Sequence, residues 1–258
     1  MNTYKLLTPG PLTTTETVRK EMMFDHCTWD DDYKAITQKI RKQLQDKLLI
    51  IANGAYGERM EDIAVHAGIP YVAYDEVYYK IPDAGRVEEI LKKDPSITHV
   101  AMVHSETTSG ILNDIQAVGK VIKEHGCTFI VDAMSSFGGV DIPVKEWGID
   151  FIISSANKCI QGVPGFSFII ADRQKLIESE GKARSLSLDL YDQWKTMNKD
   201  GKWRFTSPTH VVLAFSRALD EMMEEGGISA RSKRYYDNNR LLIRRMKELP
   251  QLIEKLGQ

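Results

Sequence analysis

An amine and a carboxylate each follow a short apolar run in this chain. Asp132 ends the run at residues 127–132, and Lys158 comes shortly after the run at residues 150–155. Ligands of open α/β sheets bind beyond the carboxyl ends of the strands, so the two side chains are expected to lie close together. A lysine that forms an imine with an aldehyde, beside an acid that keeps a pyridine nitrogen protonated, suits pyridoxal 5′-phosphate (PLP) chemistry. Burial of the lysine beside apolar strands would help it to lose its proton.

Each of these residues also has a purely structural explanation. A lysine is usually a solvated surface residue, and Asp132 has a side chain that can cap the helix after it. His104 fits a packed, hydrogen-bonded strand residue, and the Ser/Thr residues at 105–109 fit turn chemistry around Gly110. The order of the three polar segments along the chain, each after a predicted strand, is what favours a site.

The elements that must position this site alternate between strands and helices. The pattern predicts an α/β fold with a mostly parallel, mixed sheet covered by helices. Predicted strands cover residues 47–54, 97–105, 127–132, 150–155 and 165–171, and predicted helices cover residues 32–45, 58–67, 115–125, 210–227 and 228–256. The last predicted strand follows its predecessor after a tight turn. Because a parallel crossover needs about a dozen residues or more, this strand is expected to be antiparallel.

Composition excludes several classes of partner. A net charge of −2 over 258 residues creates no long-range field for nucleic acid or an anionic membrane. The start of the chain lacks the pattern of a signal peptide, and no apolar run reaches the length of a membrane span. The three cysteines are scattered without metal-ligand spacing. A cytoplasmic protein with reduced thiols and no metal site is expected.

Seven segments together resemble one family of enzymes. They are LLTPGP, FDHCTWDDDY, NGAYGERM, HSETTSGILN, VDAMSSFGG, SSANKCIQGVPGF and SLDLYDQW, which cover most of the chain. They are similar to the 2-aminoethylphosphonate–pyruvate aminotransferases, which belong to the alanine–glyoxylate branch (class V) of the fold-type-I PLP enzymes. The resemblance implies a homodimer that moves the amino group of 2-aminoethylphosphonate to pyruvate and forms phosphonoacetaldehyde and L-alanine.

The same resemblance implies roles for individual residues. Lys158 would be the Schiff-base lysine and the proton shuttle, and Asp132 would pair with the pyridinium nitrogen. The other implied positions are Met134 on one face of the ring, Thr107 near the phenolic oxygen, Asn157 near the cofactor phosphate, Thr206 and Thr209 at a phosphate of the neighbouring subunit, and Thr8, Pro9 and Gly10 on the substrate side.

Two parts of the family pattern have no counterpart in the sequence. A Gly-Ser-Gly-Thr segment that opens a phosphate-binding helix is missing near residues 45/46, and helix N-termini of this kind are natural anion sites. A small C-terminal domain with a substrate-binding arginine is also missing. We therefore expect residues 1–230 to form the PLP-binding large domain, with an N-terminal segment at 1–45. Residues 231–258 would be a helix that leads to the missing domain.

Three alternatives to this function remain open. The enzyme would be an alanine–glyoxylate or serine-type aminotransferase if its amine donor differs. A second alternative is a truncated chain that binds PLP poorly, and the two missing parts favour it. A Schiff-base lyase that uses Lys158 without PLP would have no need of Asp132.

Overall fold

The computed structural model describes residues 46–256 of the protein, and their side chains as far as residue 249. The strands are β1 (Lys47–Ala52), β2 (Tyr71–Asp75), β3 (Ile97–Val103), β4 (Ser105–Glu106), β5 (Ile111–Leu112), β6 (Thr128–Asp132), β7 (Phe151–Ser155) and β8 (Ser167–Ala171). The helices are α3 (Ala55–His66), α4 (Ala84–Lys93), α5 (Ile115–Glu124), α6 (Arg173–Glu178), α7 (Leu190–Asp200), α8 (Thr209–Glu224) and α9 (Gly227–Leu256). The predicted helix at 32–45, Cys27 and the predicted substrate-side residues Thr8, Pro9 and Gly10 lie outside the described residues.

Six strands form one mixed sheet in the order β2-β1-β3-β6-β7-β8. The first five run parallel, and β8 is antiparallel to β7, as its short connection predicts. All five predicted strands and the predicted helices at 58–67, 115–125, 210–227 and 228–256 are present, with ends shifted by a few residues. The sheet is therefore the mostly parallel, helix-covered α/β sheet that the sequence predicts.

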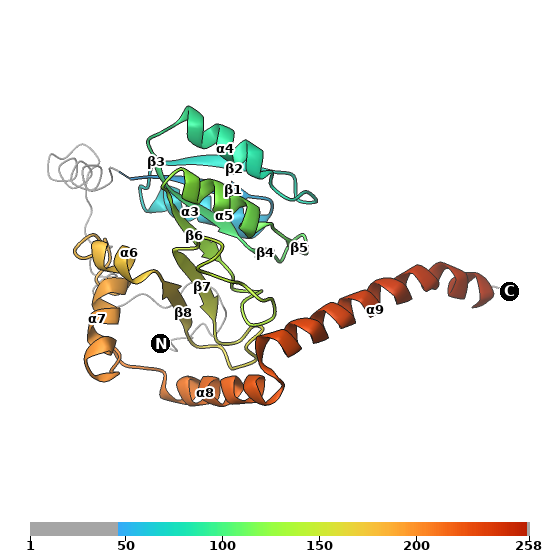
Figure 1. Ribbon diagram of the computed structural model, residues 1–258. Helices are drawn as coiled ribbons and strands as arrows, with labels where there is room; N and C mark the ends of the chain where they lie inside the picture. The colour runs from blue at the N-terminus through green and yellow to red at the C-terminus, as the bar shows by residue number, and fades with distance from the viewer. Residues whose placement is uncertain (1–45, 257–258) are drawn as a thin grey trace, which may run out of the picture.

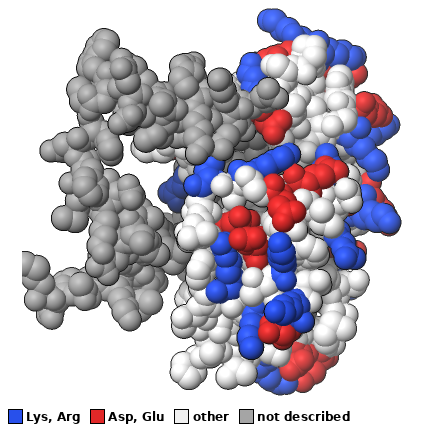
Figure 2. All heavy atoms as spheres, turned by 90° about the vertical axis from the view of Figure 1, so that its left-hand side faces the viewer, with Lys and Arg blue, Asp and Glu red and all other residues white. Residues whose placement is uncertain are grey.

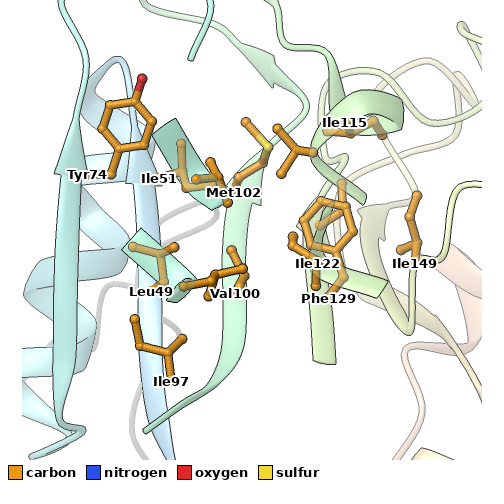
Figure 3. Packing of buried hydrophobic residues seen from close by; sticks show 14 of the residues in the cluster. Leu49, Ile51, Tyr74, Ile97, Val100, Met102, Ile115, Ile122, Phe129 and Ile149 are labelled. Atoms are coloured by element: carbon orange, nitrogen blue, oxygen red, sulfur yellow. The ribbon is translucent and has the colours of Figure 1, made fainter. Parts of the chain in front are cut away.

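The core lies between the sheet and the helices on its two faces. Alternate residues of β1 and β3, such as Leu49 and Val100, pack with Val118 of α5 in the main apolar cluster (Figure 3). On the other face, Gly57 of α3 approaches Ala52 so closely that an added Cβ would lie 2.6 Å from the Ala52 Cα atom. Strands buried on both faces are typical of a parallel sheet.

Helix α8 and the start of α9 pack against the segment that links β7 to β8. Ile160 in this segment is buried with Ala218 and Met222 of α8, and Phe137 and Phe215 pack around them. Beyond this contact, α9 extends away from the sheet as a long, mostly exposed helix (Figure 1). Its predicted domain boundary at 230/231 falls inside the first turns of one continuous helix.

The charged side chains are mixed rather than segregated. On the face shown in Figure 2, Lys and Arg alternate with Asp and Glu over the described surface. No helix among the described residues is both long enough and apolar enough to cross a membrane.

Candidate active site

Three segments meet at the carboxyl edge of the sheet, at the ends of β3, β6 and β7. The backbone N–H of His104 donates to the Asp132 carbonyl at 2.8 Å, and the Ser135 hydroxyl donates to the Ser105 carbonyl at 2.8 Å. These two bonds join the segments after β3 and β6. The Cys159 thiol donates to the Ser135 carbonyl at 3.3 Å and joins the segment after β7 to the one after β6. The predicted polar segments are therefore brought together.

Asp132 stands at the end of β6 with one carboxyl oxygen free. Its Oδ1 atom accepts a hydrogen bond from the Met134 N–H at 2.8 Å, and no described residue bonds to Oδ2. Burial raises the pKa of this carboxyl group, and the nearby Glu106 carboxyl adds to the rise. A positively charged ring N–H at Oδ2 would oppose both effects. A carboxyl group with one free oxygen therefore fits the ring nitrogen of PLP.

Lys158 lies in the tight connection after β7, and its side chain is exposed. No strand among residues 46–256 covers its amine, so the burial that the sequence predicts is not found there. The backbone around Lys158 is nevertheless fixed by two local hydrogen bonds. The Gln161 N–H donates to the Lys158 carbonyl at 2.8 Å, and the Gly162 N–H donates to the Ala156 carbonyl at 2.9 Å.

The other predicted cofactor residues fall into two groups. Met134 is half-buried next to Asp132, Asn157 is half-buried next to Lys158, and Thr107 is exposed in the turn between β4 and β5. These three lie on the segments that meet at the sheet edge. Thr206 and Thr209 are exposed around the start of α8, and no bond among the described residues ties their side chains to those segments.

His104 is a packed, hydrogen-bonded residue, as its structural explanation predicts. The residue is 2 % exposed, and its Nδ1 atom lies 2.9 Å from the Ser136 hydroxyl. Burial lowers its pKa to about 4, so the ring is neutral at pH 7. It joins the segments after β3 and β6.

Glu106 is a residue whose importance is not evident from the sequence. It is fully buried, and its Oε2 atom accepts from the N–H groups of Tyr56 and Gly57 at the start of α3. Its Oε1 atom accepts from the N–H and the hydroxyl of Thr108. A Cβ at Gly54 would lie 2.4 Å from the Glu106 Cγ atom, so glycine there is required by close approach. Glu106 thus fixes the turn that carries Thr107 to the N-terminus of α3, a favourable place for an acid.

Replacing Glu106 with glutamine is expected to destabilise the fold by about 1–3 kcal/mol, because the amide NH₂ group must face backbone N–H donors that are then left unsatisfied. Urea unfolding of the Glu106→Gln variant measures the loss. Glu89→Gln, an exposed glutamate on α4, is the matched control and is expected to unfold like the wild type. Equal midpoints for the two variants would show that the buried carboxyl group does not hold α3.

The described part of the chain contains no group of three or more His, Cys, Asp or Glu side chains that could hold a metal ion. A lysine and a free carboxyl oxygen beyond the ends of adjacent parallel strands, in a sheet with one antiparallel strand, fit the fold-type-I PLP-dependent transferases that the sequence resembles. The aminotransferase class-V family matches residues 32–255. The chain belongs to this family, and it is a PLP-dependent aminotransferase.

Relatives of known name cover most of the chain. A 2-aminoethylphosphonate–pyruvate transaminase of Lysinibacillus sphaericus is 54% identical over 283 residues, which include 96% of this chain and 77% of the relative. An enzyme of the same name from Salmonella schwarzengrund is 50% identical over 281 residues, with 95% and 77% covered. Both alignments are longer than the 258 residues of the chain, so the relatives contain residues without a counterpart inside it.

Solved structures show the same fold. The alanine–glyoxylate aminotransferase of a Nostoc species has a TM-score of 0.70 at 21% identity, and it is matched over 96% of this chain and 75% of that one. The pyridoxamine–pyruvate aminotransferase of Mesorhizobium loti has a TM-score of 0.68 at 23% identity, with 88% and 67% covered. Identities at this level support the fold and leave the substrates open.

Proposed function

We propose that the protein transfers the amino group of 2-aminoethylphosphonate to pyruvate, with phosphonoacetaldehyde and L-alanine as products. The observation that carries this proposal is the identity of 50–54% to transaminases of that name across nearly the whole chain. The meeting of the segments that hold Asp132 and Lys158 supports the amino-transfer chemistry itself.

The residues at the sheet edge fit PLP. The bound cofactor supplies an aldehyde that exchanges amines and a ring that accepts electrons. The free Oδ2 atom of Asp132 would accept a hydrogen bond from the protonated ring nitrogen, and the Met134 N–H on Oδ1 fixes the orientation of the carboxyl group. Because the pKa of Asp132 is raised in the cofactor-free chain, a cation at this position restores its ionised form.

Lys158 provides the movable amine. Its exposed side chain ends in a primary amine that would hold the cofactor through the aldehyde that the cofactor supplies. When it is not bonded to the cofactor, its Nζ atom would act as the base that takes a proton from the amine-bearing carbon of the substrate and passes it on. Flexibility of the side chain suits this transfer, and the closed backbone around Ala156–Gly162 fixes the point from which it swings.

The remaining roles are proposals that rest on the family resemblance. Met134 would lie against the ring, Thr107 near the phenolic oxygen and Asn157 near the phosphate, and Thr206 and Thr209 would reach a phosphate of a partner subunit. The substrate side is formed by residues 8–10. We also propose a homodimer, a cytoplasmic location, and a PLP-binding large domain at residues 1–230 with residues 231–258 as the helix beyond it.

A second candidate is an impaired chain that binds PLP weakly. The relatives contain residues without a counterpart in this chain, and the family's phosphate-binding segment is one of the parts that the sequence lacks. This difference favours the second candidate. Under this alternative the aminotransferase fold is retained while the affinity for the phosphate is reduced.

A visible absorbance spectrum with added PLP, before and after borohydride, tests the proposal. We expect a yellow band that borohydride bleaches while it fixes the cofactor onto the peptide with Lys158, and then alanine production from pyruvate with 2-aminoethylphosphonate as donor. Alanine and serine as donors with glyoxylate as acceptor form the comparison set. Turnover with those substrates alone would replace the proposed donor, and a protein that takes up no PLP would favour the impaired chain.

A further inference from the structure

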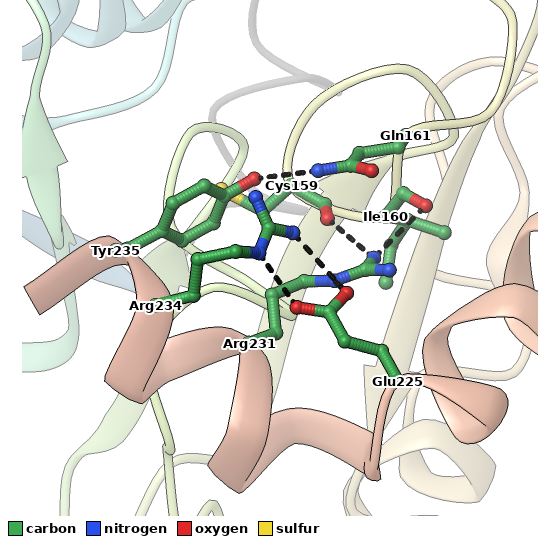
Figure 4. Close-up of polar contacts among 7 residues, drawn as sticks. All are labelled: Cys159, Ile160, Gln161, Glu225, Arg231, Arg234 and Tyr235. Atoms are coloured by element: carbon green, nitrogen blue, oxygen red, sulfur yellow. Dashed lines mark hydrogen bonds and ion pairs between the residues drawn. The ribbon is translucent and has the colours of Figure 1, made fainter. Parts of the chain in front are cut away.

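The first turns of α9 hydrogen-bond to the backbone just after Lys158 (Figure 4). The Nη1 atom of Arg231 donates to the carbonyls of Cys159 and Ile160, at 2.9 and 3.2 Å. These are the two residues that follow the lysine. The contact joins segments 72 and 71 residues apart in the sequence. The Arg231 guanidinium of α9 therefore binds the backbone next to Lys158, in the connection between β7 and β8.

Arg231 is itself fixed on its other side. Its side chain is 2 % exposed, and its Nε atom donates to the Glu225 carboxylate at 2.9 Å. Arg234 binds the same carboxylate through Nε at 2.7 Å, so Glu225 is shared between two guanidinium groups (Figure 4). A guanidinium has a rigid planar set of donors, which lets one side chain bind a carboxylate and carbonyls together.

Further contacts hold the same segment from the same side. The Ile160 side chain is buried against α8, and the Gln161 amide donates to the Tyr235 hydroxyl at 3.0 Å. Gln161 has a φ of 66°, the left-handed region that a non-glycine residue adopts only where its surroundings impose it. The α8–α9 corner thus fixes the backbone from Cys159 to Gln161, while nothing described covers the Lys158 amine.

We infer that Arg231 is a positioning residue for Lys158: it fixes the Cys159–Ile160 backbone and thereby the origin from which the lysine amine reaches the cofactor. This inference rests on the proposed function. Because the amine is exposed, the orientation of its backbone is the main constraint on where it reaches. A misplacement of about 1 Å can cost roughly 100-fold in rate.

The test compares Arg231→Lys and Arg231→Gln in the whole chain with Arg217→Lys and Arg217→Gln. Arg217 is an exposed arginine of α8 that also pairs with glutamates, so the control removes a guanidinium of similar bonding outside the segment. Three quantities are measured: hydrogen exchange of the peptide spanning residues 157–162 without PLP, the pH titration of the absorbance band with PLP, and kcat and KM separately.

We expect Arg231→Gln to raise exchange of that peptide by roughly tenfold and to lower kcat by roughly 100-fold, with little change in KM. The titration midpoint of the absorbance band should shift. Arg231→Lys should keep part of the kcat that Arg231→Gln loses, because an ammonium still donates to some of the same acceptors but reaches fewer of them than a guanidinium does. The Arg217 variants should match the wild type in all three quantities.

Exchange, titration and kcat equal to the controls in both Arg231 variants would overturn the inference. If Arg231→Gln does not fold, Glu225→Gln serves instead, because it loosens the guanidinium without removing it, and the same results decide. A wild-type chain that takes up no PLP contradicts the proposed function only. The exchange of residues 157–162 then supports or overturns the positioning role by itself.

Discussion

Replacing Lys158 with alanine is expected to abolish transamination and to leave the fold unchanged. The variant loses both the amine that holds the cofactor and the group that moves the proton. Loss of proton transfer alone costs roughly 100- to 10,000-fold. The side chain is exposed, so its removal opens no cavity and leaves no buried partner unsatisfied. Alanine production from 2-aminoethylphosphonate and pyruvate measures the rate, and circular dichroism checks the fold.

Lys145→Ala is the matched control, because Lys145 is another exposed lysine, and it lies between β6 and β7 rather than beyond β7. It should keep its rate and its borohydride-fixed cofactor, while Lys158→Ala should lose both. Turnover of Lys158→Ala at the wild-type rate would show that another amine carries the reaction.

Replacing Asp132 with asparagine is expected to lower kcat by roughly 100-fold or more while the protein still takes up PLP. An amide cannot keep the ring nitrogen protonated, so the ring becomes a weaker electron acceptor. Uptake persists because Lys158 is unchanged. The absorbance spectrum and the rate are measured on the same sample. A rate near that of the wild type would mean that a group other than Asp132 protonates the ring.

Without cofactor, Asp132→Asn is expected to make the fold more stable at pH 7, although the same substitution lowers kcat. Burial raises the pKa of Asp132 above its ordinary 3.8, so ionisation costs more in the folded chain than in the unfolded one. The carboxyl group therefore destabilises the fold as pH rises from the ordinary value through the raised one. Asp132→Asn should unfold at a higher urea concentration than the wild type at pH 7, and the difference should vanish below about pH 3.8. A variant less stable at pH 7 would contradict this sign.

The strands and the two central residues were predictable because their signals are local. Each strand next to the site is a continuous apolar run, and a parallel sheet places the ends of such runs at one edge. Asp132 and Lys158 follow those runs directly. The direction of β8 was predictable too, since a short connection excludes a parallel crossover. The pattern does not predict β2 and α4 within residues 71–93, because the apolar run of β2 is only the short segment 71–74 and the strand is half-exposed.

Residues that act through distant partners were not predictable. Glu106 looks like part of a turn until α3 is seen to start beside it, about 50 residues away in the chain. Arg231 belongs to a basic amphipathic stretch that suggests a solvated face, yet it is almost fully buried against the segment after Lys158. The exposure of Lys158 was also missed, because the apolar run before it says nothing about what covers the amine.

The distance of 72 residues between Arg231 and Cys159 also sets an order of events during synthesis. A ribosome adds about 5–20 residues per second, so Arg231 is made roughly 4–14 s after Cys159. During that interval the nascent sheet can pair its parallel strands, while the segment after Lys158 has no guanidinium behind it. The nascent chain therefore carries its reactive amine before it carries the group that holds the neighbouring backbone. If Arg231 positions Lys158 as inferred, the lysine reaches its working geometry only after the first turns of α9 have been made and have docked.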